Sequence, residues 1–163
     1  MKILHICTYD KGGATTAALR LHVGLLRLGV HSKMLFLEKS ERGQGIPVKS
    51  YYLGKGKTFI EKILLKLNLK ETHQKKFSRL MAKNKYPGEV YALAASDYDI
   101  TKHPAYLKAD IINLHWVVGF IDYKTFFLKN NKPLVWTLHD QNAFTGICHY
   151  SGSCNKYTNN CSQ

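Results

Sequence analysis

The sequence contains no long apolar run, and none of its apolar segments approaches the roughly 20 residues that a membrane-spanning helix requires. It also lacks the pattern of a secretory signal peptide, because His5, Tyr9 and Asp10 interrupt the apolar residues of the N-terminus and no small-residue cleavage site follows. The sequence therefore predicts a cytoplasmic protein whose thiols are reduced.

Acidic residues are also few, at 11 Asp and Glu against 24 Lys and Arg, and the formal net charge is +13. Such a charge favours an anionic partner, which can be nucleic acid, an anionic membrane surface or a phosphorylated small molecule. The chain carries no signature of a nucleic-acid-binding module, and its basic residues lack interleaved aromatic residues that stack on bases. Nucleic acid is therefore not expected as a partner.

The most basic segment, Lys55–Lys85, has two interpretations. Its apolar residues share one face of a predicted helix, and they are Phe59, Ile60, Ile63, Leu64 and Leu67. In one interpretation this amphipathic helix binds an anionic membrane, which would make the protein peripheral at the inner membrane face. In the other, the apolar face belongs to the core and the lysines are simply solvated.

With 163 residues, of which 45% are hydrophobic, the chain is long enough for a single globular domain over residues 1–163. Its first 30 residues have the pattern of a strand, a glycine turn and a helix. The strand is an almost continuous apolar run, which is typical of a strand buried on both faces of a parallel sheet. Gly12 and Gly13 then allow a sharp turn. Either Thr15 or Thr16 is expected to cap the helix.

The predicted helix is apolar around most of its circumference, so we expect it to be largely buried. Gly29 ends it. Further along the chain, the pattern predicts strands at residues 30–37, 48–53, 109–116 and 134–138 and a helix at 123–129. This alternation predicts an α/β fold, a Rossmann-like parallel sheet with helices on both faces. Ligands of such sheets bind at the carboxyl ends of the strands.

Several chemically distinctive residues follow predicted strands. Gly12 and Gly13 can hold a phosphate or a sugar with backbone amides, or form an ordinary tight turn. They match neither the dinucleotide-binding pattern G-x-G-x-x-G nor the Walker motif. His139 and Asp140 follow the last strand, and His139 can donate a hydrogen bond or act as acid or base, unless it is a structural histidine.

His115 and Trp116 stand at the end of the predicted strand 109–116, where Trp116 can stack on a sugar or pack in the core. Three cysteines near the C-terminus, Cys148, Cys154 and Cys161, have the spacing C-x5-C-x6-C. They suggest a structural zinc clip, with free thiols or a disulfide as the alternatives, because the usual C-x2-C knuckle is absent.

Two stretches carry a resemblance to a known family. They are KHPAYLKADIINLHWVVGFI, at residues 102–121, and KPLVWTLHDQNAFTGICHYSGSCNKYTNNC, at residues 132–161. Together with the glycine turn and the long first helix, they are very similar to the N-terminal domain of GT-B retaining glycosyltransferases of the group 1, or family four, type. The similarity is to a bacterial branch that makes surface polysaccharides.

The resemblance implies an enzyme that transfers a sugar, with retention, from a nucleotide-sugar donor to a glycan or lipid-linked acceptor. His139 would be the active-site histidine, and Gly12, Gly13 and Asp140 would lie near the phosphates and sugar of the donor. The acceptor side would include His115, Trp116 and Thr15. No metal or other cofactor is required for this chemistry in the family.

The chain stops at Gln163, and it lacks the second domain that supplies the nucleotide pocket in this family. The resemblance therefore predicts an N-terminal, acceptor-side domain that is inactive alone. The alternative function is a stand-alone basic module that binds an anionic membrane or nucleic acid and uses its cysteines as a metal clip.

Overall fold

The computed structural model describes residues 1–38, 50–53, 63, 66–67, 71–73, 75–77, 79 and 91–159. These residues form a five-stranded sheet in which every pair of neighbouring strands is parallel, with the order β3-β2-β1-β4-β5. The strands are β1 (Lys2–Tyr9), β2 (His31–Glu38), β3 (Ser50–Tyr52), β4 (Ile111–Leu114) and β5 (Leu134–Trp136). This is the strand order of a Rossmann-like fold, so the predicted fold class is confirmed.

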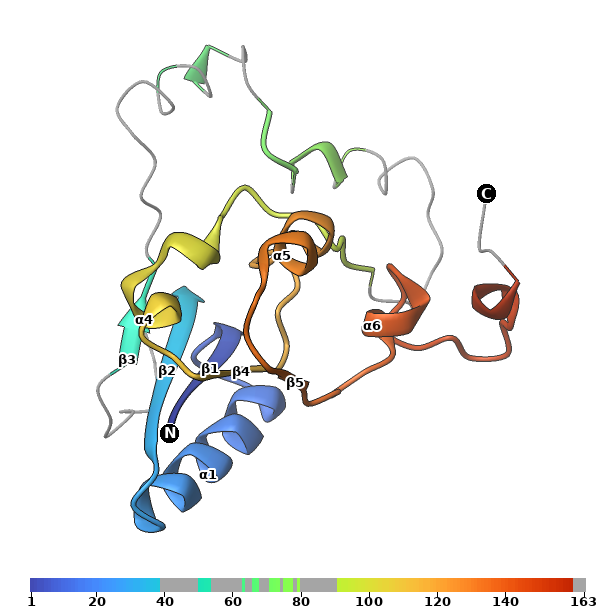
Figure 1. Cartoon of the computed structure of the whole chain (residues 1–163). Coiled ribbons are helices and arrows are strands. Elements are labelled where there is room, and N and C mark those ends of the chain that lie inside the picture. Colours follow the sequence, from blue (N-terminus) through green and yellow to red (C-terminus); the bar gives the residue numbers. More distant parts are fainter. Residues whose placement is uncertain are drawn as a thin grey trace.

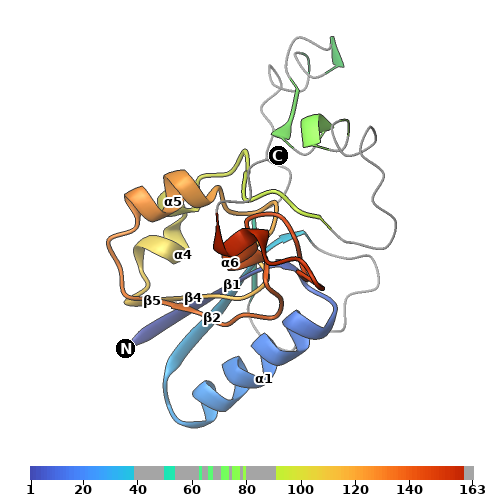
Figure 2. The same cartoon turned by 90° about the vertical axis from the view of Figure 1, so that its right-hand side faces the viewer.

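Helices lie on both faces of the sheet (Figure 1). Helix α1 (Gly13–Arg27) covers one face, and α4 (Pro104–Leu107) and α5 (Tyr123–Lys129) cover the other, as the turned view also shows (Figure 2). The short helix α6 (Asn142–Thr145) follows β5, and single 3-10 turns lie at Ile100–Lys102 and Lys156–Thr158. The predicted helix at residues 123–129 is confirmed.

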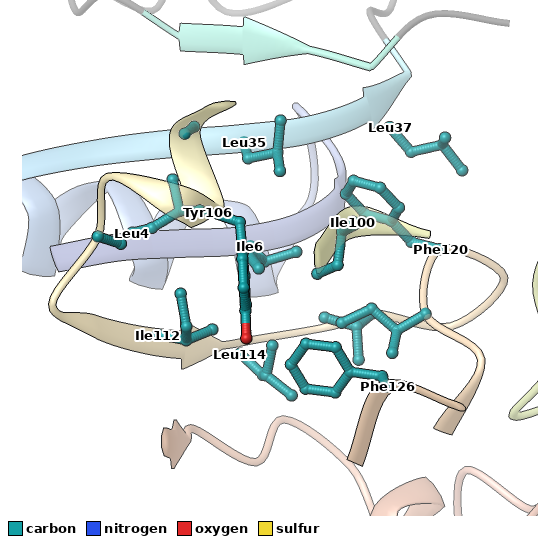
Figure 3. Packing of buried hydrophobic residues seen from close by; sticks show 14 residues of the cluster. Leu4, Ile6, Leu35, Leu37, Ile100, Tyr106, Ile112, Leu114, Phe120 and Phe126 are labelled. Carbon is teal, nitrogen blue, oxygen red and sulfur yellow. The ribbon is translucent and has the colours of Figure 1, made fainter. Parts of the chain in front are cut away.

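The larger core lies between the sheet and the helices α4 and α5 (Figure 3). Leu4 and Ile6 of β1 point to this side, together with Ile112 and Leu114 of β4. Because side chains alternate along a strand, the residues between them, including His5, point to the other face, toward α1. On that face the apolar cluster is smaller and consists of Cys7, Ala18, Met34 and Phe36.

The expected capping of α1 is wrong. The helix begins at Gly13, and its N-cap residue is Gly12, which has no side chain to accept a hydrogen bond. Because the helix begins earlier than expected, the two threonines lie in its first turn and donate backward. The Thr15 hydroxyl donates to the carbonyl oxygen of Tyr9 at 2.7 Å, and that of Thr16 donates to the carbonyl oxygen of Gly12 at 3.0 Å.

The expected burial of α1 is also wrong. Only Thr15, Ala18 and His22 of this helix are buried, while Leu21 and Leu26 are 42% and 40% exposed. The helix contacts the sheet along one face, and no other element among the described residues covers its outer face. Gly29 ends the helix region with a φ of 74°, as predicted.

Some boundaries differ from the predicted ones. The strands β4 and β5 are shorter than the predicted ranges, and α6 and the last 3-10 turn lie after them in a part of the chain for which no element was predicted. Strand β3 falls within the predicted range of 48–53, of which residues 48 and 49 lie outside the described part. No helix of the described part is long and apolar enough to cross a bilayer.

Most of the basic segment Lys55–Lys85 lies outside the described residues. Two of its described apolar residues, Ile63 and Leu67, are 41% and 61% exposed. Its association with a membrane stays a prediction.

Candidate functional site

The candidate site lies where the strand order reverses. Strand β1 is followed in sequence by β2 on one side of it, while β4 pairs on its other side. In open parallel sheets, the carboxyl ends of two such strands leave a crevice in which ligands bind. Here the glycine turn leaves the end of β1, and His115 and Trp116 follow the end of β4.

A cavity of about 380 Å³ opens at this point and is called the switch-point cavity below. Its walls bring together six of the residues that the sequence singled out, namely Gly12, Gly13, Thr15, Trp116, His139 and Asp140. The remaining wall residues are Cys7, Tyr9, Lys11, Ala14, His149 and Tyr150. The structure thus gathers the carboxyl ends of β1, β4 and β5 around one space.

The glycine turn exposes the beginning of α1 to this cavity. Gly12 has φ 100° and ψ 177°, a backbone conformation that is essentially restricted to glycine. The first turn of α1 contains no acidic residue, and its N-cap residue, Gly12, makes no side-chain hydrogen bond to it. The first N–H groups of a helix have no partner within the helix and carry its positive partial charge. The cavity wall formed by Gly12, Gly13 and Ala14 is therefore suited to an anion.

His139 lies at the edge of the cavity and is held from behind by His115. Their ring nitrogens, His139 Nε2 and His115 Nδ1, are 3.1 Å apart. His115 in turn contacts His5, with 3.1 Å between His115 Nε2 and His5 Nδ1. Burial lowers the pKa of His139, although the nearby Asp140 carboxylate opposes this shift.

Asp140 contacts protein groups on both of its carboxylate oxygens. Oδ2 accepts a hydrogen bond from the indole N–H of Trp116 at 2.9 Å and lies 2.7 Å from Nδ1 of His149. Oδ1 accepts a hydrogen bond from the backbone N–H of Asn142 at 2.9 Å. Asp140 therefore positions Trp116 and His149, and its charge is already engaged before any ligand binds.

Aromatic rings continue this wall of the cavity. Trp116 stacks on Tyr9, with ring centroids 5.4 Å apart, and lies 5.7 Å from the ring of His149. Tyr9 and Tyr150 are 37% and 67% exposed, so they offer ring surface to a ligand. Trp116 itself is half-buried and belongs partly to the apolar packing under α1.

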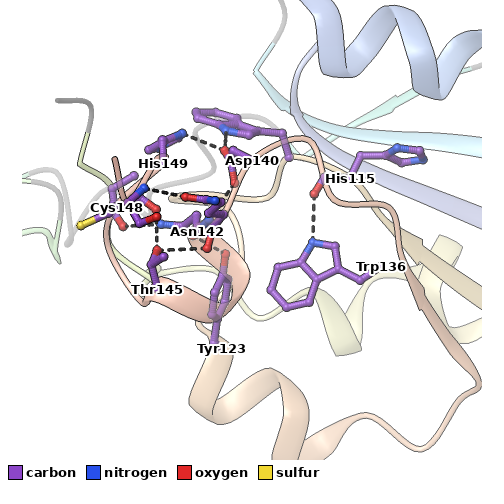
Figure 4. A network of polar contacts seen from close by, with 12 residues as sticks. His115, Tyr123, Trp136, Asp140, Asn142, Thr145, Cys148 and His149 are labelled. Atoms are coloured by element: carbon purple, nitrogen blue, oxygen red, sulfur yellow. Dashed lines mark hydrogen bonds and ion pairs between the residues drawn. The ribbon is translucent and has the colours of Figure 1, made fainter. Parts of the chain in front are cut away.

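A polar network fixes the segment that carries Asp140 (Figure 4). Asn142 is 2% exposed, and its side chain accepts a hydrogen bond from the hydroxyl of Tyr123 and donates one to the carbonyl oxygen of Ala92. Trp136 donates its indole N–H to the carbonyl oxygen of His115 at 3.2 Å. The site thus rests on α5, α6 and β5 as well as on β1 and β4.

A second cavity, of about 360 Å³, adjoins the first and is called the neighbouring cavity below. The two cavities share Tyr9, Trp116 and His149. The neighbouring cavity also has two carboxylates in its walls, those of Glu38 at the end of β2 and of Asp97. Carboxylates and aromatic rings suit a ligand rich in hydroxyl groups.

Two of the residues expected on the acceptor side, His115 and Thr15, are almost completely buried. His115 is 2% exposed and lines neither cavity, because it is packed behind His139. Thr15 lines the switch-point cavity, but the residue is only 1% exposed. Its hydroxyl donates to the backbone carbonyl oxygens of Tyr9 and Lys11. Neither residue exposes its side chain appreciably, and their assignment to the acceptor side stays a prediction.

The predicted cysteine cluster is only partly described. Cys148 and Cys154 form no disulfide with each other, and Cys161 lies outside the described residues. Among the residues that the structure describes, no group of three or more His, Cys, Asp or Glu side chains is placed to hold a metal ion. Structural zinc therefore stays a prediction.

Sequence reasoning missed several residues of the site. Tyr9 and Lys11 could have been found, because they lie between a buried strand and a glycine turn. His149 and Tyr150 carry no such signal, since the chain returns to the cavity only through the turn after α6. The antiparallel bridge between Tyr91 and Cys148 helps to hold that return.

Comparisons of the chain with known protein families, with curated proteins and with solved structures find no match.

Proposed function

We propose that the switch-point cavity binds the sugar and diphosphate of a nucleotide-sugar donor. The chain would then be the N-terminal, acceptor-side domain of a retaining glycosyltransferase of the GT-B type. The single observation that carries the proposal is the meeting of the glycine turn at the α1 N-terminus with His139 in one cavity. The resemblance of the sequence to this family supplies the class of reaction.

The diphosphate would lie against the glycine turn. Backbone N–H groups at Gly13 and Ala14, the positive end of α1 and the Lys11 ammonium all favour negative charge there. In the transfer, the bond between the anomeric carbon and the diphosphate oxygen would break while a bond to the acceptor hydroxyl oxygen forms, and the hydroxyl proton would pass to the leaving diphosphate. The leaving diphosphate gains negative charge, and fixed positive groups lower the barrier for that step.

The sugar would lie toward His139 and the aromatic wall. A histidine N–H can donate to a sugar hydroxyl, and the exposed ring surface of Tyr9 can pack against a sugar face. A cavity of about 380 Å³ falls in the range of roughly 300–1,000 Å³ that is usual for small-molecule sites.

The acceptor, a glycan or a lipid-linked glycan, would occupy the neighbouring cavity. The two cavities share the wall of Tyr9, Trp116 and His149, so an acceptor hydroxyl in one would lie next to a sugar in the other. Glu38 and Asp97 can accept hydrogen bonds from other hydroxyl groups of the acceptor. Binding of both substrates side by side is what a direct transfer requires.

Sugar transfer by the native gene product tests this proposal. The purified protein is incubated with a panel of radiolabelled nucleotide sugars and a membrane extract from its source cell, and labelled product is counted. We expect transfer from at least one donor and a loss of about 100-fold or more in the His139→Ala variant, the range typical of lost catalytic side chains. His31→Ala, which removes an exposed histidine of β2, is the matched control. Equal transfer by the His139→Ala variant, or no transfer from any donor, would overturn the proposal.

A further inference from the structure

Three histidines form a file that runs from the switch-point cavity into the interior. His139 is at the cavity, His115 is behind it and His5 is innermost, with ring centroids 5.4 Å apart at each step. The two contacts join ring nitrogens at 3.1 Å, which is hydrogen-bond distance. His5 is fully buried and His115 is 2% exposed, so the file is closed off from water on its inner side.

The two inner rings are neutral at physiological pH. Burial and the neighbouring rings lower the pKa of His5 to about 3 and that of His115 to about 4. A neutral imidazole has one N–H and one nitrogen lone pair, so it donates on one side and accepts on the other. The hydrogen bonds must therefore all point in one direction along the file, either outward to the cavity or inward.

The inner end of the file favours the outward direction. Nε2 of His5 is buried, and no hydrogen-bond partner lies near it among the described residues. If the bonds pointed inward, this atom would carry an N–H without an acceptor. If they point outward, it carries only a lone pair, and buried donors without an acceptor are rarer in proteins than buried acceptors without a donor.

The file ends at His5. The ring of His22 on α1 meets the ring of His5 edge-on, with centroids 5.9 Å apart, and no hydrogen bond joins them. His22 Nδ1 instead lies 2.6 Å from the hydroxyl of Ser32. His22 is therefore equally buried and adjacent, but it does not belong to the file.

We propose that His115, backed by His5, is a positioning residue that holds His139 in the Nδ1–H tautomer. In the outward direction His115 Nδ1 donates to His139 Nε2, and the remaining proton of His139 is on Nδ1. His139 lines the switch-point cavity, and its remaining donor would then be Nδ1–H, which suits a phosphate oxygen or a sugar hydroxyl. This inference deepens the proposed function, but the tautomer is a property of the free protein and needs no substrate.

Two-bond ¹H–¹⁵N correlation spectra of the chain with labelled histidine, recorded at pH 7, test the proposal. They distinguish the two neutral tautomers of each histidine by the shifts of the protonated and unprotonated nitrogens. We expect His5, His115 and His139 all to be Nδ1–H, although neutral histidine in water prefers Nε2–H. An Nε2–H tautomer at His115, or at His139, would overturn the proposal. This measurement needs only the wild-type chain.

A matched pair of variants separates positioning from packing. In His115→Asn the side-chain amide can still donate to His139 Nε2, so His139 should stay Nδ1–H. In His115→Leu, which has a similar volume, the donor is lost and His139 should change to mainly Nε2–H. His22→Gln alters a buried histidine outside the file, and His139 should be unchanged in it. A tautomer at His139 that is the same in the Leu and Asn variants would contradict the positioning role.

The tautomer result and the proposed function can fail separately. If His139 is Nδ1–H but the native gene product transfers no sugar, the inference about the file is supported and the glycosyltransferase proposal is lost. If sugar is transferred but His139 is Nε2–H, the proposed function is supported and the inference about His115 is overturned.

Discussion

The buried histidines hydrogen-bond to one another, but their burial on folding costs free energy. His5 and His115 are almost completely buried, and each keeps hydrogen-bonding atoms away from water. Hydrogen bonds within the file offset part of this cost, but a charged ring would be far more costly in the same place. The site therefore depends on these residues staying neutral, and acid conditions should weaken the fold.

We expect the free energy of unfolding to fall as the pH drops below about 6.5. The folded-state pKa values of His5 and His115, about 3 and about 4, lie below the unfolded value of about 6.5, so the unfolded chain binds more protons in this window. Each histidine should remove roughly 2 kcal/mol between pH 7 and pH 5. Above pH 6.5 their contribution to the slope should disappear.

Urea unfolding at several pH values measures this effect. In the His5→Leu variant the loss between pH 7 and pH 5 should be smaller than in the wild type by roughly 2 kcal/mol. Other titrating groups cancel in that difference, and His31→Leu, which removes an exposed histidine, is the control. A pH slope in His5→Leu as steep as that of the wild type would show that His5 is not buried in its neutral form.

At the scale of single residues, the sequence predicted the site better where a residue follows a strand. His139 and Trp116 were identified because they come directly after apolar strands, and both line the switch-point cavity. The supporting role of His115 was missed, because a pattern along the chain does not tell which side of a strand end faces the ligand. His5 was missed because it lies inside an apolar run, where alternation places it opposite α1 but does not name its neighbours.

At the scale of elements, the turn between β1 and α1 has two glycines with different tasks. Gly12 has a positive φ of 100°, so only glycine adopts its conformation without strain. Gly13 is the first residue of α1 and has no positive φ, and a Cβ there would meet no described atom within 4 Å. Gly12 is therefore needed for the backbone conformation of the turn. Gly13, which lines the cavity, keeps space there for a ligand because it has no side chain.

Substitution of each glycine by alanine should separate these tasks. Gly12→Ala should destabilise the protein by roughly 1–3 kcal/mol, because alanine is strained at this φ. Gly13→Ala should leave stability unchanged or raise it slightly, but should weaken the binding of pyrophosphate, because a methyl group would stand where the anion approaches. Thermal unfolding and calorimetric titration measure the two effects. Equal pyrophosphate affinity in Gly13→Ala and wild type would contradict the close approach of an anion to this residue.

Element boundaries and burial show where the sequence pattern stops being informative. The helix α5 has the bounds that the sequence pattern predicted, and the structure adds that Asp122 caps its N-terminus. The burial of α1 was overestimated, because an apolar helix surface does not reveal whether a further layer covers it. Leu21 and Leu26 remain exposed on that outer face. The start of α1 was misplaced because Gly12, without a side chain, acts as its N-cap.

At the scale of the whole molecule, strand order determines where a ligand can bind. The order β3-β2-β1-β4-β5 places the glycine turn and the end of β4 side by side, although they are about a hundred residues apart in sequence. The sequence predicted a parallel sheet and therefore a site at its carboxyl edge. The return of residues 140–150 to that edge follows from the buried contacts of Asn142, which no periodicity encodes.

The central claim is that the switch-point cavity binds a sugar phosphate through the start of α1 and His139. The most direct test is an NMR titration of the ¹⁵N-labelled chain with pyrophosphate and with glucose 1-phosphate. The account predicts that the amide signals of Gly13 and Ala14 and the ring signals of His139 shift together and saturate. Saturable shifts that are confined to lysine-rich surface residues, with no change at Gly13, Ala14 or His139, would contradict it.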